Sequence, residues 1–332
     1  RRQLERSTPL QFSPQENLAD LFEQLAAWQQ PPSKGDDGSF LPFLSQKPPS
    51  VADLAMLGDF WLPEAVDRQL LQAIDADLLS PLSNDPIDWN ELLRRDDRLW
   101  GAPYRWGPLV IAYRTDKFAT LGWTPSDWGD LWKPELRRRI SFPDSARVTI
   151  GTALKRLGAS YNSENLDAVP ELEDTLRQLQ SQVKLYSSDA YLPPLLLGDT
   201  WAAVGWSADV LSLPQYGKTI GAIVPRSGTA LWADLWVRPA QATTESELWR
   251  KWVQFCWQPE IAARLSVLTG GASPVLAGVE GDDRPAGLQN RPVLYPDRQV
   301  LRRSEFLLPL SDTAIAQYLD LWVAMRSDRI AS

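Results

Sequence analysis

The stretch Asp53-Leu54-Ala55-Met56-Leu57-Gly58-Asp59-Phe60-Trp61 is an apolar run that ends in a glycine, a carboxylate and two aromatic rings. Its first part belongs to a predicted buried strand over Val51–Met56, and a helix over Pro63–Ile74 is expected after it. In open α/β sheets, ligands bind beyond the carboxyl ends of strands. The stretch therefore predicts an α/β fold and makes Asp59, Phe60 and Trp61 candidate ligand-binding residues.

The same alternation of short apolar runs and amphipathic segments continues on both sides of this stretch. Further strands are predicted at Pro9–Pro14, Leu109–Tyr113, Arg139–Phe142, Val183–Tyr186, Ala202–Gly205, Thr219–Val224 and Leu235–Val237. Helices are predicted at Asn17–Gln29, Asp127–Trp132, Ser145–Leu157, Pro170–Gln182, Glu245–Trp257, Pro259–Leu268 and Asp312–Met325. The segment Gln30–Pro49 is rich in Pro, Gly, Ser and Lys and is predicted to be irregular.

Five segments near predicted strand ends carry aromatic and small polar residues: Gly58–Trp61, Tyr104–Gly107, Asp144–Ser145, Trp206–Ser207 and Trp232–Asp234. We expect the ligand-binding residues among them. The candidates are Asp59, Phe60, Trp61, Tyr104, Trp106, Asp144, Ser145, Trp206, Ser207, Trp232 and Asp234.

The 332 residues contain sixteen tryptophans and no histidine. Histidine is the usual general base near neutral pH and the commonest metal ligand, so its absence removes most hydrolase and metalloenzyme mechanisms. Tryptophan offers a broad π-face and one N–H donor, which suits core packing and the binding of flat or cationic ligands. The composition favours a binding protein with no catalytic residues. Core packing is expected for Trp123, Trp128 and Trp132 and for Trp249, Trp252 and Trp257.

Charge and motifs narrow the function further. The net charge of −8 argues against nucleic-acid binding, and the one compact basic run, Arg137–Arg139, is expected on a solvated surface. The lone Cys256 cannot form an internal disulfide and is expected to be buried. No phosphate-binding loop and no metal-ligand spacing is present, so no cofactor and no metal are expected. No apolar window is long enough to cross a bilayer.

A glycosidase stays open as an alternative, because that chemistry needs two carboxylates and no histidine. Aspartates near predicted strand ends are Asp59, Asp144, Asp209 and Asp234. Each of them also fits a helix cap or a surface charge. The sequence does not decide between these roles.

Taken in order, six stretches resemble the type II periplasmic solute-binding proteins of ABC importers, in particular the spermidine/putrescine-binding group. They are Asp53–Trp61, Ala102–Gly107, Ser126–Glu135 with Pro143–Arg147 after it, Gly205–Ser207, Leu231–Asp234 and Ser273–Pro274. The resemblance implies a two-lobed fold with a ligand cleft at the hinge. It implies lobe 1 at residues 1–107 and 233–279, with its first strand missing, and lobe 2 at 108–232 and 280–332. The chain would cross between lobes near Gly107, Trp232 and Val279.

By the same resemblance, the expected partners are a small polar solute and a membrane ABC permease, and the protein is expected to be a periplasmic monomer. The opening residues Arg1–Arg6 read like the end of a helix, so we expect that an N-terminal segment has been removed or left out of this chain. In the family, tryptophans stack on the ligand and acidic residues meet its ammonium groups. Trp206, Trp232, Asp234 and Phe60 match such positions.

Four positions depart from the family pattern. Ser145 and Val148 stand where acidic residues are expected, Gly271 where an aromatic is expected, and Leu307 where a glutamine is expected. An ammonium without a carboxylate partner is costly to desolvate, so these departures weaken the case for a di- or triamine. The function expected is delivery of a polyamine or another small polar solute to an ABC transporter. The alternative is a divergent interaction or scaffold protein without polyamine binding.

Overall fold

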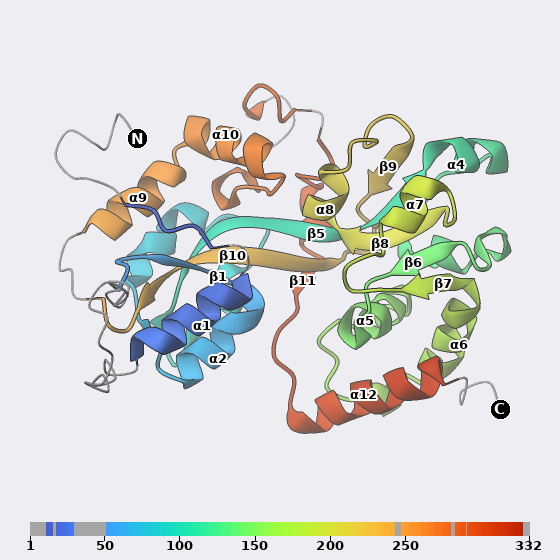
Figure 1. The fold of residues 1–332 in the computed structure, drawn as a ribbon, viewed down its shortest axis with the longest axis horizontal. Coiled ribbons are helices and arrows are strands. Elements are labelled where there is room, and N and C mark those ends of the chain that lie inside the picture. The colour runs from blue at the N-terminus through green and yellow to red at the C-terminus, as the bar shows by residue number, and fades with distance from the viewer. Residues whose placement is uncertain are drawn as a thin grey trace, which may run out of the picture.

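The computed structural model describes residues 11–15, 18–29, 51–242, 247–279, 283–289 and 291–327. Helices gather in two lobes at the two ends of one continuous nine-stranded sheet (Figure 1). Two long strands, β5 and β10, run side by side through the middle and join the lobes (Figure 1). The predicted two-lobed α/β architecture is confirmed.

The strands are β1 Ala55–Gly58, β2 Leu71–Gln72, β3 Arg94–Arg95, β4 Arg98–Leu99, β5 Ala102–Arg114, β6 Ile140–Phe142, β7 Val183–Tyr186, β8 Ala202–Trp206, β9 Ile220–Ile223, β10 Ala230–Pro239 and β11 Glu305–Phe306. The main sheet has the order β1-β10-β5-β8-β6-β7, with β2 and β11 on β10 and β9 on β5. β3 and β4 form a separate hairpin.

The α-helices are α1 Leu18–Gln29, α2 Leu62–Asp67, α3 Trp89–Leu93, α4 Thr115–Leu121, α5 Ala146–Arg156, α6 Leu172–Gln182, α7 Pro193–Leu197, α8 Ser207–Leu211, α9 Leu248–Cys256, α10 Pro259–Thr269, α11 Arg298–Leu301 and α12 Asp312–Arg326. Short 3₁₀ helices include η1 Asp59–Trp61, η2 Ala76–Leu82 and η3 Trp128–Trp132. None of the described helices is both long and apolar enough to span a membrane.

The strand β5 divides its partners between the lobes. Residues 102–108 pair with β10, whereas residues 109–114 pair with β8 and β9. The apolar run Leu109–Ala112 is fully buried because both faces of β5 are covered there: Leu109 and Ile111 pack in the second core, and Val110 and Ala112 pack in a smaller apolar cluster on the other face. A single strand therefore contributes to both lobes, and Gly107 lies where its partners change.

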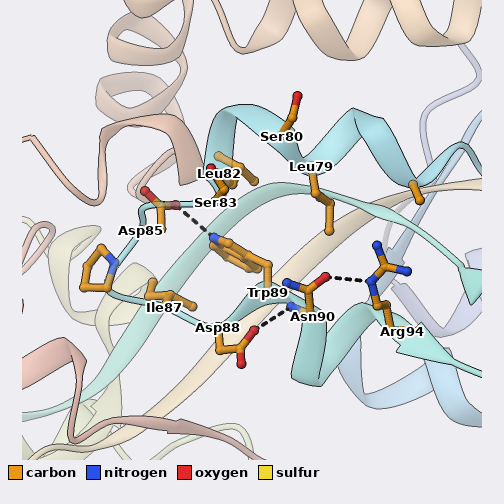
Figure 2. A pocket seen from close by; sticks show the side chains of 12 residues that line it. Leu79, Ser80, Leu82, Ser83, Asp85, Ile87, Asp88, Trp89, Asn90 and Arg94 are labelled. Atoms are coloured by element: carbon orange, nitrogen blue, oxygen red, sulfur yellow. Dashed lines mark hydrogen bonds between the residues drawn. The ribbon is translucent and has the colours of Figure 1, made fainter. Parts of the chain in front are cut away.

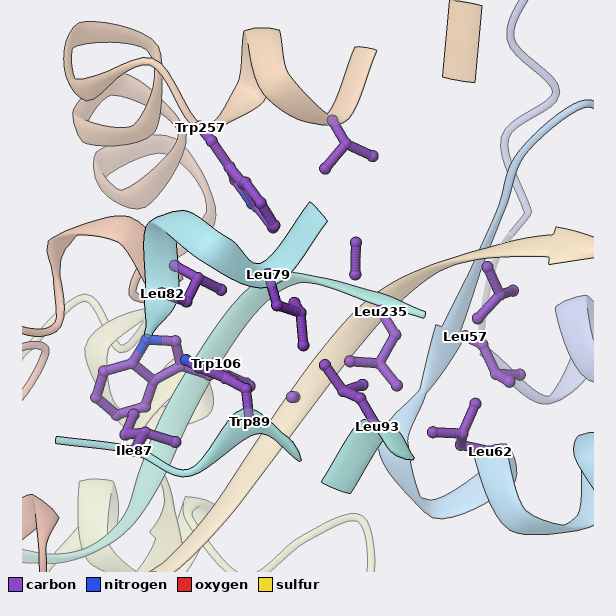
Figure 3. Packing of buried hydrophobic residues seen from close by; sticks show 14 of the residues in the cluster. Leu57, Leu62, Leu79, Leu82, Ile87, Trp89, Leu93, Trp106, Leu235 and Trp257 are labelled. Atoms are coloured by element: carbon purple, nitrogen blue, oxygen red, sulfur yellow. The ribbon is translucent and has the colours of Figure 1, made fainter. Parts of the chain in front are cut away.

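Two large hydrophobic cores correspond to the lobes. The first contains Trp89, Trp106 and Trp257, which are labelled in Figure 3. The second contains Trp128 and Trp132. The predicted core roles of Trp128, Trp132, Trp249 and Trp257 are confirmed by their burial, as is the burial of Cys256. Trp123 and Trp252 are partly buried and pack against other aromatic rings.

The two cores indicate where the chain passes from lobe 1 to lobe 2 for the last time. Leu288, Tyr295 and Phe306 pack in the first core, whereas Tyr318 and Met325 of α12 pack in the second. β11 lies parallel to β10 at Ala230 and Leu231. We therefore propose that the chain passes to lobe 2 for the last time at β11, not near Val279.

Several predicted elements differ from the structure. The strand predicted at Val51–Met56 is β1, which spans Ala55–Gly58 and therefore ends directly before Asp59. The helix expected to reach Ile74 ends at Asp67, because Gln69 adopts a left-handed conformation (φ 56°) and the chain turns into β2. The described part of Pro9–Pro14 is not a strand, and Gln30–Pro49 and Arg1–Arg6 lie outside the described residues.

The most important difference concerns Tyr104–Gly107 and Trp232–Asp234, which were predicted as turn-like segments at strand ends. Both lie inside strands, in β5 and β10. This half of β5 contains Pro103, Gly107 and Pro108, and its strand partner among the described elements is β10; on the opposite edge Trp106 forms a single bridge to Ala272. Proline is tolerated in such a position because no ladder bond from its nitrogen is needed.

Candidate functional site

Side chains alternate between the two faces of β10 where it meets β5. Leu231, Ala233 and Leu235 point into the first core, so Trp232 and Asp234 share the opposite face. Asp234 pairs with Arg105 of β5 and Trp232 with Gly107. The crossing strands therefore place a tryptophan, a carboxylate, a guanidinium and a glycine together on one face.

Arg105 occupies the space around Asp234 and Trp232. Its Nε donates to Asp234 Oδ2 at 2.5 Å, and its guanidinium carbon lies 5.5 Å from the centre of the Trp232 ring. The Asp234 side chain is 3% exposed. Burial raises the pKa of the Asp234 carboxyl, and the charge and hydrogen bond of Arg105 oppose that rise. The carboxylate expected to meet a ligand ammonium thus already has a cationic partner in this chain.

The glycine at position 271 makes room for that partner. A Cβ on Gly271 would lie 2.9 Å from Arg105 Cδ and 3.1 Å from its Cβ. Arg105 Nη1 also donates to the Thr269 carbonyl oxygen at 3.2 Å. The departure at Gly271 and the position of Arg105 are therefore parts of one arrangement. Sequence reasoning missed Arg105, although it lies inside the quoted stretch Ala102–Gly107.

Gly107 brings together two donors from elements that are far apart in the chain, Ser207 of α8 and Trp232 of β10. A Cβ there would lie 2.3 Å from Ser207 Oγ and 2.7 Å from Trp232 Nε1, so both side chains pack against the same bare backbone. Ser207 begins α8, directly after β8. Both atoms are buried and lack a hydrogen-bond partner in the part of the chain that the structure describes. Unpartnered buried donors are unusual, which makes this junction a candidate for ligand contact.

Asp59 lies beside the same junction, because Gly58 pairs with Asp234. The Ala233 amide donates to Asp59 Oδ2 (3.1 Å) and the Phe60 amide to Oδ1 (2.9 Å). Burial raises the pKa of the Asp59 carboxyl to about 7, and the Asp234 charge adds to this effect, while the amide donors lower it. Asp59 therefore titrates near neutral pH and ties η1 to β10.

Four of the predicted residues point elsewhere. Phe60 is 76% exposed, whereas Trp106 is fully buried in the first core. The Trp61 ring stacks on Phe22 of α1 at 4.7 Å, and Tyr104 packs against Trp236 at 4.8 Å. Packing explains the positions of Trp61, Tyr104 and Trp106 without a ligand, and their binding role stays a prediction.

The remaining predicted residues lie in lobe 2. Trp206 ends β8 and packs partly against the second core. The Ser145 hydroxyl accepts from the Val148 amide and so caps α5. Asp144 is exposed and pairs with Arg326 of α12 at 2.7 Å. Val148 is buried and Leu307 packs against the second core, so both of these departures have a structural explanation.

The aspartates considered for a glycosidase are engaged within the chain. Asp144 pairs with Arg326, Asp234 pairs with Arg105, and Asp209 accepts from the Tyr191 hydroxyl at 2.6 Å. The described residues contain no group of His, Cys, Asp and Glu suited to a metal ion.

A cavity of about 530 Å³ opens elsewhere, between η2 and α3 in lobe 1. Figure 2 shows Asp85 accepting from Trp89 Nε1 at its edge. None of the candidate ligand-binding residues from the sequence analysis lines this cavity. The candidate residues that the structure brings together lie at the junction of the crossing strands: Trp232 and Asp234 on β10, with Asp59 of η1 and Ser207 of α8 beside them.

Comparison with known proteins gives three kinds of match. A family model described as bacterial extracellular solute-binding protein matches residues 50–303. The spermidine/putrescine-binding periplasmic protein of Salmonella typhimurium is 26% identical over 83% of this chain and 78% of its own length. A putrescine-binding periplasmic protein of Escherichia coli is 26% identical, with 79% and 75% covered. The spermidine/putrescine substrate-binding protein of Streptococcus pneumoniae has a similar fold, with a TM-score of 0.72, 23% identity and 84% of each chain covered.

Proposed function

The chain belongs to the family of bacterial extracellular solute-binding proteins, and from that premise we propose that it delivers a small polar, amine-containing solute to an ABC permease. Its relatives include spermidine- and putrescine-binding proteins, which supports a polyamine-like solute. Their periplasmic location supports an extracytoplasmic place of action. We also propose that the protein acts as a monomer and does not catalyse a reaction.

The observation that carries the proposal is the junction on the crossing strands. Asp59 and Asp234, the Trp232 ring and the Ser207 hydroxyl meet where β5 passes from one lobe to the other. Hinged lobes that close on a ligand exclude water from it, which strengthens each polar contact. A side chain from lobe 2, Ser207, reaches the lobe 1 cluster, so a solute held here would contact both lobes.

A thermal-shift screen tests the proposal, using polyamines, amino acids, small peptides and sugars. A ligand that binds only the folded chain raises its melting temperature in a concentration-dependent way. We expect at least one amine-containing solute to do so, and native mass spectrometry to show one bound molecule per monomer. No shift with any solute would contradict the proposal and favour the scaffold alternative.

Two matched variants test whether the solute binds at the junction of the crossing strands. Trp232→Phe and Trp123→Phe each remove one buried indole N–H that lacks a partner among the described residues, but Trp123 lies in lobe 2, against Phe118. Loss of a ligand hydrogen bond is worth about 1 kcal/mol, or roughly fivefold in affinity. We expect this loss with Trp232→Phe and unchanged affinity with Trp123→Phe. Equal effects of the two variants would place the solute elsewhere.

A further inference from the structure

The subsite formed by Trp232 and Asp234 is filled by a cation of the chain itself. Arg105 holds Asp234 through Nε, lies over the Trp232 ring and donates through Nη1 to the Thr269 carbonyl. Gly271 leaves the space in which the Arg105 stem lies. An aromatic ring and a carboxylate are the partners that a ligand amine would use. In this chain the Trp232 ring and the Asp234 carboxylate contact the Arg105 guanidinium instead.

What this subsite still offers is hydrogen-bond donors. A guanidinium has five N–H donors. The structure gives partners to Nε and Nη1, and none to Nη2 among the residues it describes. The Arg105 side chain is 28% exposed, so part of the group is open to solvent. An added ammonium would face a like charge, whereas a carboxylate would meet a planar donor pair of matching geometry.

Two more donors stand beside the guanidinium. Trp232 Nε1 can only donate, and the Ser207 hydroxyl can donate. Both are buried without a partner in the described ranges, and both pack against Gly107, two residues from Arg105. Because these atoms are covered, a solute reaches them only when the lobes move apart. The junction therefore combines one cation with two neutral donors. Its nearest carboxylate, Asp234, is already paired with that cation, and the Asp59 carboxyl beside it accepts from the Ala233 and Phe60 amides.

We propose that the solute presents a carboxylate to this subsite, where it is held by Arg105 with Ser207 and Trp232 as further donors. The proposal rests on the proposed function and narrows its substrate class to a zwitterion with an ammonium group and a carboxylate. A diamine or triamine is disfavoured because its second ammonium would lie against Arg105.

The experiment is a titration by calorimetry with three series of linear solutes, three to six carbons long: α,ω-diamines, ω-amino carboxylates and dicarboxylates. The charge of Arg105 is removed in Arg105→Met, which keeps an unbranched stem but lacks the guanidinium group. The matched control is Arg326→Met, which breaks the surface ion pair with Asp144. We expect the ω-amino carboxylate of the best length to bind wild type about tenfold or more tightly than the diamine of that length. Arg105→Met should reverse this order and Arg326→Met should keep it.

Because Arg105→Met leaves a buried carboxylate unpaired, it can lose stability. The double variant Arg105→Gln, Asp234→Asn removes both charges and leaves two neutral groups that can bond. It should lose about tenfold or more in affinity for the ω-amino carboxylate without gaining the diamine. A diamine that binds wild type most tightly, or an unchanged order in both Arg105 variants, would overturn the carboxylate proposal and leave the solute-binding function standing. Failure of every solute to bind the folded wild type would overturn both.

Discussion

The carboxyl group of Asp59 should make the stability of this protein fall as the pH rises towards neutrality. Burial raises its folded-state pKa from 3.8 to about 7. Between these values the folded chain holds a proton that the unfolded chain has released, so protons favour the folded state. The contribution is fully present below pH 3.8 and is lost as the pH rises through about 7. One pKa unit corresponds to about 1.4 kcal/mol, which makes the total up to roughly 4 kcal/mol.

The variant Asp59→Asn isolates this contribution. An asparagine oxygen can still accept from the Ala233 or Phe60 amide, but the side chain no longer carries a charge. Urea unfolding without ligand, between about pH 4 and about pH 8, gives the free energy of unfolding of both proteins. We expect little difference near pH 4 and an advantage of up to roughly 4 kcal/mol for the variant near pH 8.

The control is Asp174→Asn, which removes an exposed carboxylate of α6 that pairs with Arg177 on the surface. Its effect should stay below about 1 kcal/mol at every pH. The reasoning fails if the difference between Asp59→Asn and wild type is the same at pH 5 as at pH 8. It also fails if the variant is the less stable protein near pH 8.

Three further predictions concern packing. Gly151→Ala puts a Cβ 2.1 Å from Cδ1 of the buried Tyr161 ring and should lower the free energy of unfolding by about 1–3 kcal/mol. The control Gly129→Ala has open space around it and should not lower the free energy of unfolding, so equal denaturation midpoints of the two variants would contradict the prediction. Trp128→Phe removes an indole that donates to a backbone carbonyl at 2.9 Å and should lower the free energy of unfolding by about 1–3 kcal/mol, measured by chemical denaturation. An unchanged free energy of unfolding would mean that the carbonyl finds another donor. Cys256 is 4% exposed, and burial raises its thiol pKa to about 12. A thiol reagent should therefore label it only in denaturant, and rapid labelling of the native protein would contradict its burial.

Local patterns predicted the lobe 2 elements best. The strand Val183–Tyr186 has the predicted bounds, and β6, α5 and α6 begin or end within a few residues of prediction. Here turn residues, helix caps and apolar periodicity all favour the same element, so local information suffices. Ser145 illustrates this, since its hydroxyl caps the helix that follows it.

The crossing strands were predicted less well for a physical reason. β5 contains Pro103, Gly107 and Pro108, which read as a turn in isolation. They are compatible with a strand because, in this half of β5, the edge opposite β10 forms a single bridge among the described residues, from Trp106 to Ala272, and needs no bond from a proline nitrogen. That partner comes from a segment more than a hundred residues away, and periodicity in one segment carries no information about it.

Residue types and their spacing along the chain were enough to predict an α/β protein with the order of segments of an extracellular solute-binding protein, and to select Trp232 and Asp234 together. The contacts of Asp234 could not be predicted in this way, because they depend on how distant segments pair. The antiparallel register of β5 and β10 places Arg105 opposite Asp234, and the glycine at 271 lets the guanidinium stay there. A charge that looked available to a ligand is thus neutralised by a residue whose proximity arises from strand pairing across the hinge.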